Sequence, residues 1–281
     1  MTTSSLLPGI HDGIPSEQYH AHPNSISSSG LRRLLPPHCP AVYRYGEFES
    51  SDTLDFGKVA HRLVLGEGDD FEVAPFDSWR TKAAQEFKAA ANESGKVPIL
   101  RADYAKAYAM AMAVARHPWA GKLFTEGKAE QSLVWTDPDT GVTCRARFDW
   151  LRDVVEGRRL IIPDYKTARS AHPEKFARSA ADFGYHQQAA FYIDGAIALG
   201  LDPDPAFVFV VQEKQAPYLV TVVELDDEAI KLGRALNQKA LRIYAECVAN
   251  DDWPGYHDGV ASVALPNYYV YSTEEFLSND D

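Results

Sequence analysis

The sequence predicts an α/β domain in which a mixed central sheet is flanked by helices, with an N-terminal helical elaboration. Two blocks of strand-like residues predict the sheet. The first block covers 130–136, 142–152 and 159–166, and the second covers 206–213 and 217–224. A helical stretch separates the blocks, and strands that alternate with helices are typical of a sheet covered by helices.

Helical periodicity dominates the first part of the chain. Ser27 or Ser28 is expected to cap a short helix that Pro36 stops. Between Phe56 and Val64 the apolar residues recur at i, i+3, i+4, i+7 and i+8, the pattern of an amphipathic helix. Helices are predicted over 30–35, 54–65, 79–94 and 101–117.

Turn residues connect the strands of the first block. Asp137–Gly141 and Glu156–Arg158 are short polar segments with glycine, which predict tight turns and hence an antiparallel meander of three strands. Helices are predicted over 173–181, 185–199 and 226–249.

Composition and charge restrict the class of protein. The 281 residues are 45% hydrophobic and 24% charged, which excludes a disordered chain, a collagen and a coiled coil. No apolar run approaches the ~20 residues that span a bilayer, and the N-terminus lacks the basic start of a secretory signal. The three cysteines are dispersed, as expected in a reducing compartment. We therefore expect a cytoplasmic protein with no membrane partner.

The distribution of charge suggests three regions. Residues 1–28 are rich in Ser, Pro, His and Gly and predict an extended arm, whereas 29–250 predict a single domain with a helical part (29–120) and a core (121–250). The net charge is −12, and 251–281 form a tail with seven acids and no Lys or Arg. So acidic a chain is not expected to coat nucleic acid, although the stretch 142–188 holds nine bases against six acids.

Two carboxylates and a lysine form the sharpest local pattern. Asp164 and Lys166 are two residues apart on a predicted strand, so their side chains share one face. The preceding turn brings Asp149 beside Asp164, and two converging carboxylates repel each other unless a cation lies between them. Oxygen ligands of this kind suit Mg²⁺ or Mn²⁺. The alternative is a surface ion pair between Asp164 and Lys166.

Polar residues on two predicted helices add to this pattern. Tyr185, Gln188 and Tyr192 occupy i, i+3 and i+7 and share one helix face, which is either the wall of a cleft or an aromatic core stripe with a paired amide. His61 lies at the edge of an apolar face and is either a ligand or a structural histidine. Glu130, at the start of the first strand of the meander, is a further candidate carboxylate.

Taken in order, these segments resemble the PD-(D/E)xK nuclease superfamily. Within it they are similar to the RecE-type, exonuclease VIII-like exodeoxyribonucleases of phages and prophages. The resemblance extends over most of residues 15–250 and rests on Tyr19-His20, Ser27–Leu31, Cys39–Ala41, Phe56–Leu65, Arg80–Lys82, Arg145–Asp149, Asp164–Thr167 and Tyr185–Tyr192. Related nucleases usually carry Glu at the position of Asp164. The resemblance implies a restriction-endonuclease-like core.

The resemblance also implies roles for individual residues. The metal ligands would be His61, Asp149, Asp164, the carbonyl of Tyr165 and Glu130. Lys166, Asp149, Asp164, Gln188 and Tyr192 would be catalytic, with Lys166 orienting the attacking water. Arg145, Arg147, Arg169, Tyr185 and Tyr192 would contact DNA. No iron–sulfur cluster is expected, because three dispersed cysteines do not supply its four ligands.

The function that the resemblance implies is an Mg²⁺-dependent exodeoxyribonuclease. It would degrade one strand of linear duplex DNA, 5′ to 3′, and pass the remaining strand to a RecT-type annealing protein. We expect a homo-oligomeric ring, a trimer or tetramer, around double-stranded DNA ends. The alternatives are an endonuclease, a nuclease for single strands or RNA, a DNA-end-binding protein without strong activity, and a structural domain in which these residues form ion pairs.

Overall fold

The structure is a computed structural model that describes residues 6–20, 22, 24–46 and 52–278. Its strands are β1 (Gly9–His11), β2 (Ser25–Ile26), β3 (Phe71–Ala74), β4 (Val97–Leu100), β5 (Gly127–Thr136), β6 (Thr143–Arg152), β7 (Ile161–Ala168), β8 (Ala206–Glu213) and β9 (Val220–Glu224). Its helices are α1 (Ser16–His20), α2 (Ser28–Arg33), α3 (Pro40–Tyr45), α4 (Asp52–Leu65), α5 (Lys82–Glu93), α6 (Arg101–Arg116), α7 (Ala120–Leu123), α8 (Pro173–Asp182), α9 (Tyr185–Ala198), α10 (Asp227–Asn250) and α11 (Asn267–Ser278). No helix in these ranges is long and apolar enough to cross a membrane.

The strands form a mixed α/β core, as predicted. β5 and β6 pair antiparallel, β1 adds antiparallel to β5, and β2 adds parallel to β6. β7 pairs parallel with β8, which pairs antiparallel with β9. The predicted three-stranded meander is therefore wrong in its last strand. β7 packs beside β6 but joins the ladder of β8, because Leu160 accepts from Ala206 and so fixes the two strands in parallel register.

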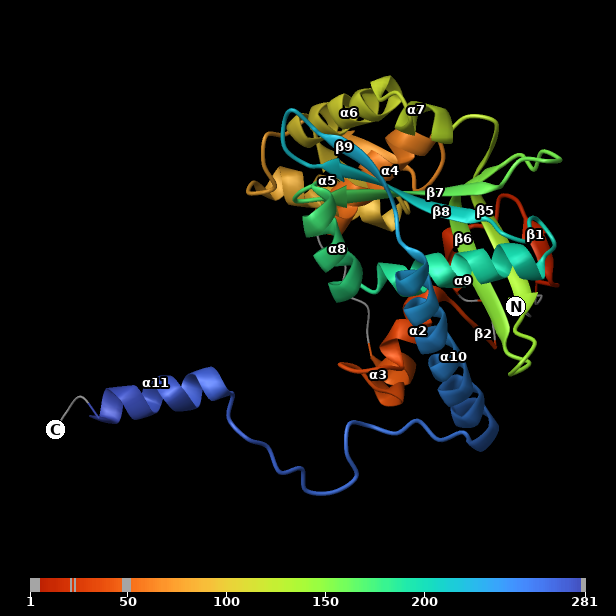
Figure 1. Cartoon of the computed structure of the whole chain (residues 1–281). Coiled ribbons are helices and arrows are strands. Elements are labelled where there is room, and N and C mark those ends of the chain that lie inside the picture. The colour runs from red at the N-terminus through yellow and green to blue at the C-terminus, as the bar shows by residue number, and fades with distance from the viewer. Residues whose placement is uncertain (1–5, 21, 23, 47–51, 279–281) are drawn as a thin grey trace.

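Helices cover both faces of the β7–β9 sheet (Figure 1). Successive residues of a strand point to opposite faces, so each face has its own apolar cluster. Phe207 and Phe209 of β8 face the cluster formed with α8, α9 and α10. Val208 and Val210 face the cluster formed with α4, α6 and α7. A strand that is buried on both sides in this way leaves only its end free for polar side chains.

The predicted helices of the N-terminal part are present. Ser27 caps α2 by accepting from the backbone of Gly30, and Thr81 caps α5 by accepting from Ala84. α6 ends at Arg116, before Pro118, because the residue that precedes a proline avoids the helical conformation. The parallel strands β3 and β4 were not predicted, since each is only four residues long.

The described residues between 9 and 26 pack against the sheet, which corrects the prediction of an extended arm for this part of residues 1–28. Ile10 lies opposite Leu133 in the ladder with β5, and Ile26 lies opposite Cys144 in the ladder with β6. Ile26 is fully buried in the main apolar cluster. The segment was mistaken for an arm because its strands are only two and three residues long.

The C-terminal residues, in contrast, leave the body of the protein. α10 ends at Asn250, and Trp253 still stacks on Tyr43 at a ring-centroid distance of 5.8 Å. Beyond residue 254 the chain extends outward and ends in α11, which has no buried residue (Figure 1). α11 was not predicted within the acidic tail.

A glycine sets the distance between α9 and α10. A Cβ atom at Gly233 would lie 2.1 Å from the carbonyl oxygen of His186, a backbone atom that cannot move aside. We expect Gly233→Ala to lower the free energy of unfolding by roughly 2–3 kcal/mol, the cost of overpacking a core contact. Urea denaturation measures this change. Gly255→Ala is the control, because a Cβ there meets no atom within 4 Å. Equal stabilities of the two variants would contradict the packing argument.

Candidate nuclease site

A cleft of about 1040 Å³ contains most of the predicted site residues. The first turns of α9 and the strands β5–β7 form its base and walls, while α4 and the segment around α1 close other sides. The predicted residues that line it are His61, Glu130, Arg147, Asp149, Tyr165, Lys166, Tyr185, Gln188 and Tyr192. Asp164 lies buried directly below, with 1% of its surface exposed.

Asp149, Asp164 and Lys166 meet where β6 and β7 run side by side. The Asp149 carboxylate accepts a hydrogen bond of 2.7 Å from the backbone N–H of Tyr165, which fixes β6 against β7. The Lys166 Nζ lies 2.5 Å from Asp164 Oδ2. Since Lys166 is only 22% exposed, this is a largely buried ion pair. The predicted convergence of the two aspartates is confirmed.

Helix α9 brings an amide to the same carboxylate. Gln188 Nε2 donates to Asp164 Oδ1 at 2.6 Å. Tyr192 donates from its hydroxyl to the backbone carbonyl of Arg147 at 3.0 Å, and the Tyr185 ring lies 5.5 Å from Lys166 Nζ. The shared face of these residues therefore borders the cleft, and its aromatic rings also pack on the core.

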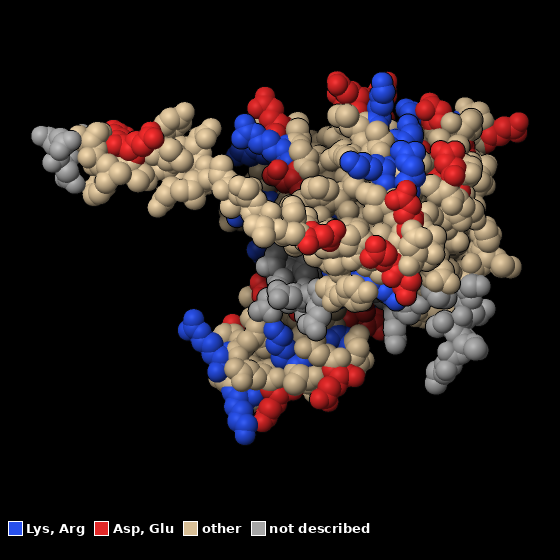
Figure 2. Space-filling model, turned by 90° about the horizontal axis from the view of Figure 1, so that it is seen from below, with Lys and Arg blue, Asp and Glu red and all other residues tan. Residues whose placement is uncertain are grey.

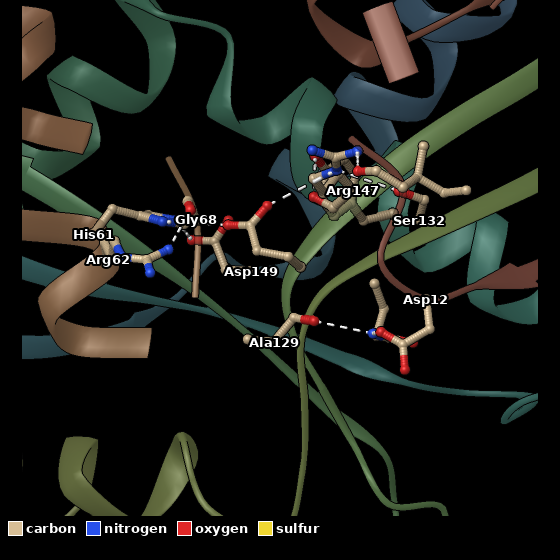
Figure 3. A network of polar contacts seen from close by, with 12 residues as sticks. Asp12, His61, Arg62, Gly68, Ala129, Ser132, Arg147 and Asp149 are labelled. Carbon is tan, nitrogen blue, oxygen red and sulfur yellow. Dashed lines mark hydrogen bonds and ion pairs between the residues drawn. The ribbon is translucent and has the colours of Figure 1, made fainter. Parts of the chain in front are cut away.

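His61 of α4 lies between two carboxylates (Figure 3). Its Nε2 is 3.0 Å from Asp149 Oδ2, and its Nδ1 is 3.4 Å from Glu130 Oε1. Glu130 and Asp149 stand at opposing positions of β5 and β6, where the pairing of the two strands is interrupted. Glu130 has a φ of 51°, a conformation that costs a non-glycine residue energy and is found mostly at functional sites.

The charges in the cleft shift one another's protonation. Burial raises the pKa of Asp164 to about 6, with Asp149 adding to the effect and Lys166 opposing it. Burial also raises the pKa of Glu130 to about 7. Burial opposes the protonation of His61, but the charge and hydrogen bond of Asp149 outweigh it and raise the pKa of His61 to about 9. The Asp164 and Asp149 charges likewise raise the pKa of Lys166 against the effect of burial.

The donor set suits a hard divalent cation. Within the described residues, no group of three His, Cys, Asp or Glu side chains is arranged as a ready-made metal site. The charge of Asp149 nevertheless raises the energy of the charged forms of both Glu130 and Asp164, and Asp164 Oδ2 has an ion pair but no hydrogen bond. Carboxylate oxygens held close together under mutual repulsion are what Mg²⁺ or Mn²⁺ stabilises. Asp149, Asp164 and Glu130 therefore fit such an ion.

The three arginines that were expected to contact DNA differ in their surroundings. Arg147 lines the cleft, donates to the carbonyl of Ile14 at 2.7 Å and stacks on Tyr19. Arg169 is exposed just after β7, outside the residues that line the cleft. Arg145 is buried, and its guanidinium donates to the backbone carbonyl and hydroxyl of Ser25. The expectation for Arg145 is corrected: this side chain anchors β2 and is not available to a ligand.

Sequence reasoning missed one wall of the cleft. Tyr19, Ser27, Ser28, Ser29 and Arg32 line it together with Lys214. The residues before 30 were interpreted as an arm, so their contact with the core was not foreseen. The sequence feature that could have indicated this contact is the run Ser27–Ser29, which supplies both a helix cap and hydroxyl groups that line the cleft.

A buried polar chain behind the cleft was also missed. The Tyr165 hydroxyl donates to Gln212 Oε1 at 2.5 Å, and Gln212 Nε2 donates to the carbonyl of Met110 at 2.8 Å. Gln212 is fully buried. Because Tyr165 stands between Asp164 and Lys166, this chain connects their strand to β8 and α6. A single glutamine in an apolar strand gives no sequence signal of its partners.

The raised pKa of His61 predicts how stability varies with pH in metal-free protein. A histidine with a pKa of about 9 in the folded state and 6.5 in the unfolded state stabilises the fold fully below pH 6.5, and the stabilisation is lost as pH rises through 9. Between pH 7 and 9.5 we expect wild-type protein in EDTA to lose roughly 2 kcal/mol more unfolding free energy than His61→Gln. Equal losses in the two proteins would show that His61 is not charged between its carboxylates.

A solved structure of another protein shares the fold of this chain. A "Putative exonuclease" of Eubacterium rectale shares the fold with a TM-score of 0.61 at 15% identity, covering 92% of this chain and 98% of that chain. A phage related exonuclease from Haemophilus somnus aligns with a TM-score of 0.32 at 14% identity over 81% of this chain and 96% of that one, too distant to carry an argument. The search of curated proteins found no match.

One family model covers most of the chain, including the strands β5–β9. It spans residues 27–265 and is described as a PDDEXK-like domain of unknown function (DUF3799). This span includes His61, Glu130, Asp149, Asp164 and Lys166. The resemblance to PD-(D/E)xK nucleases is thereby confirmed, and the chain belongs to this family of PDDEXK-like domains.

Proposed function

We propose that this nuclease-type domain is a divalent-metal-dependent DNA exonuclease. The observation that carries the proposal is the convergence of Asp149, Asp164 and Lys166 in one cleft, with Gln188 bonded to the buried carboxylate. These groups come from three different elements, β6, β7 and α9. Ion pairs that serve only stability are not expected to bring mutually repelling carboxylates together.

The reaction is hydrolysis of a phosphodiester bond. Water attacks the phosphorus atom, and the bond from phosphorus to the leaving oxygen breaks. A bound Mg²⁺ held by Asp149, Asp164 and Glu130 would supply positive charge that stabilises the developing phosphorane. Lys166 stays protonated beside Asp164, so its ammonium group orients the attacking water and donates to a phosphate oxygen. Gln188 holds the Asp164 carboxylate in place, both as a ligand for the ion and as the partner of Lys166.

The choice of an exonuclease acting 5′ to 3′ rests on the resemblance to RecE-type enzymes. In the same proposal the protein forms a trimeric or tetrameric ring on double-stranded DNA ends and transfers the product strand to a RecT-type annealing protein. The net charge of −12 supports a protein that holds DNA by enclosing it, because enclosure requires less attraction to phosphate. An endonuclease on the same scaffold is the second candidate.

We expect Lys166→Met to lower the rate of cleavage by about 10²–10³-fold, because the variant loses a charge that stabilises the transition state. The assay uses end-labelled linear duplex DNA with Mg²⁺, Mn²⁺ or EDTA, beside a closed circle. The label that is released first gives the polarity of the enzyme. Lys214→Met is the matched control, since Lys214 lines the same cleft but forms no ion pair with Asp164. Its effect is expected to be at least tenfold smaller.

The outcomes of this assay separate the candidates. Metal-dependent release from the linear duplex alone supports an exonuclease, whereas cleavage of the closed circle supports an endonuclease. Binding of ends without cleavage by folded protein would contradict the enzyme. Equal activities of Lys166→Met and wild type would remove Lys166 from the reaction.

Asp164→Asn tests the metal ligands separately from catalysis. The amide keeps the shape of the side chain. It removes a charge that burial disfavours, but it also removes the ion-pair partner of Lys166. Because these two effects oppose each other, we expect the unfolding free energy in EDTA at pH 8 to change by less than about 1 kcal/mol. Addition of Mn²⁺ is expected to raise the melting temperature of wild type but not that of the variant. An equal rise in both proteins would place the ion elsewhere.

A further inference from the structure

The C-terminal helix α11 has no partner in its own chain. Its root is fixed, because Trp253 stacks on Tyr43 and the backbone N–H of Ala41 donates to the carbonyl of Pro254. From residue 255 onward the described chain has almost no contact with the body (Figure 1). Val260 is 98% exposed, and α11 contains no buried residue.

The composition of α11 is unusual for a helix surrounded by water. Apolar and aromatic side chains are exposed on all sides of it, and no Lys or Arg occurs in the chain after residue 242. Its large exposed side chains are Tyr268, Tyr269, Tyr271, Phe276 and Leu277. An isolated helix of twelve residues is marginally stable in water, so such a helix normally gains its stability from a surface that covers it.

One exposed face of α10 has the complementary chemistry. Lys231, Ala235, Lys239 and Arg242 recur at i, i+4, i+8 and i+11 and therefore share one side of the helix, beside the exposed Leu232. The three cations, Lys231, Lys239 and Arg242, form no ion pair with another described residue. The chain holds no acid from residue 229 to residue 245, so the face is basic as well as partly apolar.

The two surfaces match in charge and in length. Figure 2 shows acidic and no basic side chains on the projecting segment that includes α11. Glu274 and Glu275 supply that charge within the helix. Twelve residues of helix are about 18 Å long, and the face from Lys231 to Arg242 is about 17 Å long. An acidic, aromatic helix thus matches a basic face with apolar residues between its charges.

We propose that α11 docks on the basic α10 face of a second copy of this chain. α11 lies away from its own α10 (Figure 1), which leaves the α10 face of each copy free for the helix of another copy. Each copy would give one helix and accept another. Such a head-to-tail contact uses two different surfaces and closes into a ring when the rotation between copies permits. The contact lies outside the cleft and does not depend on the proposed nuclease activity.

Charge reversal of each surface tests the proposal in the full chain. One variant carries Lys239→Glu and Arg242→Glu on α10, and the other carries Glu274→Lys and Glu275→Lys on α11. Light scattering at micromolar concentration, without DNA or divalent ions, is expected to give a multiple of 31.2 kDa for wild type and the monomer mass for each variant. Lys175→Glu with Arg178→Glu is the matched control, since these cations have the same spacing on α8 and are exposed. This control is expected to keep the wild-type mass.

Mixing decides whether the helix binds its own chain or a second copy. When the two variants are mixed in equal amounts, the acidic helix of one meets the basic face of the other, and the reversed pair is also complementary. We expect the mixture to assemble again, and to regain the wild-type mass when the ring holds an even number of copies, because the two variants have to alternate. A monomeric wild type, variants that keep the wild-type mass, or a mixture that stays monomeric would each overturn the proposal. Circular dichroism checks that both variants fold, and cleavage of linear DNA measured in parallel reports a failure of the nuclease separately.

Discussion

The repulsion among the carboxylates of the cleft is the constraint on which the arrangement of the site depends. Asp149, Asp164 and Glu130 would not remain close together unless positive or donating groups faced them. Lys166 faces Asp164, His61 stands between Asp149 and Glu130, and Gln188 donates to Asp164. Because these compensating groups come from β7, α4 and α9, the two helices have to be fixed against the sheet for the site to exist.

The scaffold fixes the site through elements that are buried on two sides. β7 and β8 carry an apolar cluster on each face, so the polar end of β7 has little freedom. Tyr165, Gln212 and the carbonyl of Met110 connect that end to α6 through hydrogen bonds of 2.5 and 2.8 Å. Glu130 has an unfavourable backbone conformation, with a φ of 51°. Its neighbours Ala129 and Gln131 both pair with β6, and these pairings hold that conformation.

Acidic residues are concentrated in the C-terminal segment, whereas the cleft contains several cations. The seven acids after residue 250 account for more than half of the net charge of −12. Of these, Asp258, Glu274 and Glu275 lie on the described segment that leaves the body. The cleft instead presents Arg32, Lys58, Lys166 and Lys214 among its acids. An acidic total charge is therefore compatible with a site for a polyanion. In the proposals made above, the acidic segment serves assembly and the cleft serves hydrolysis.

Local pattern determined the helices, the mixed α/β class and the placement of Asp164 and Lys166 on one strand. Periodicity, caps and turns act over a few residues and can be recognised in a single chain. The partner of β7, the place of residues 9–26 in the sheet, the burial of Arg145 and the contact between Tyr165 and Gln212 were decided by tertiary structure alone. These features join segments up to 125 residues apart, as in the pairing of Gly9 with Val134. Nothing in the local sequence specifies which distant group will pair with a buried strand edge, guanidinium or amide.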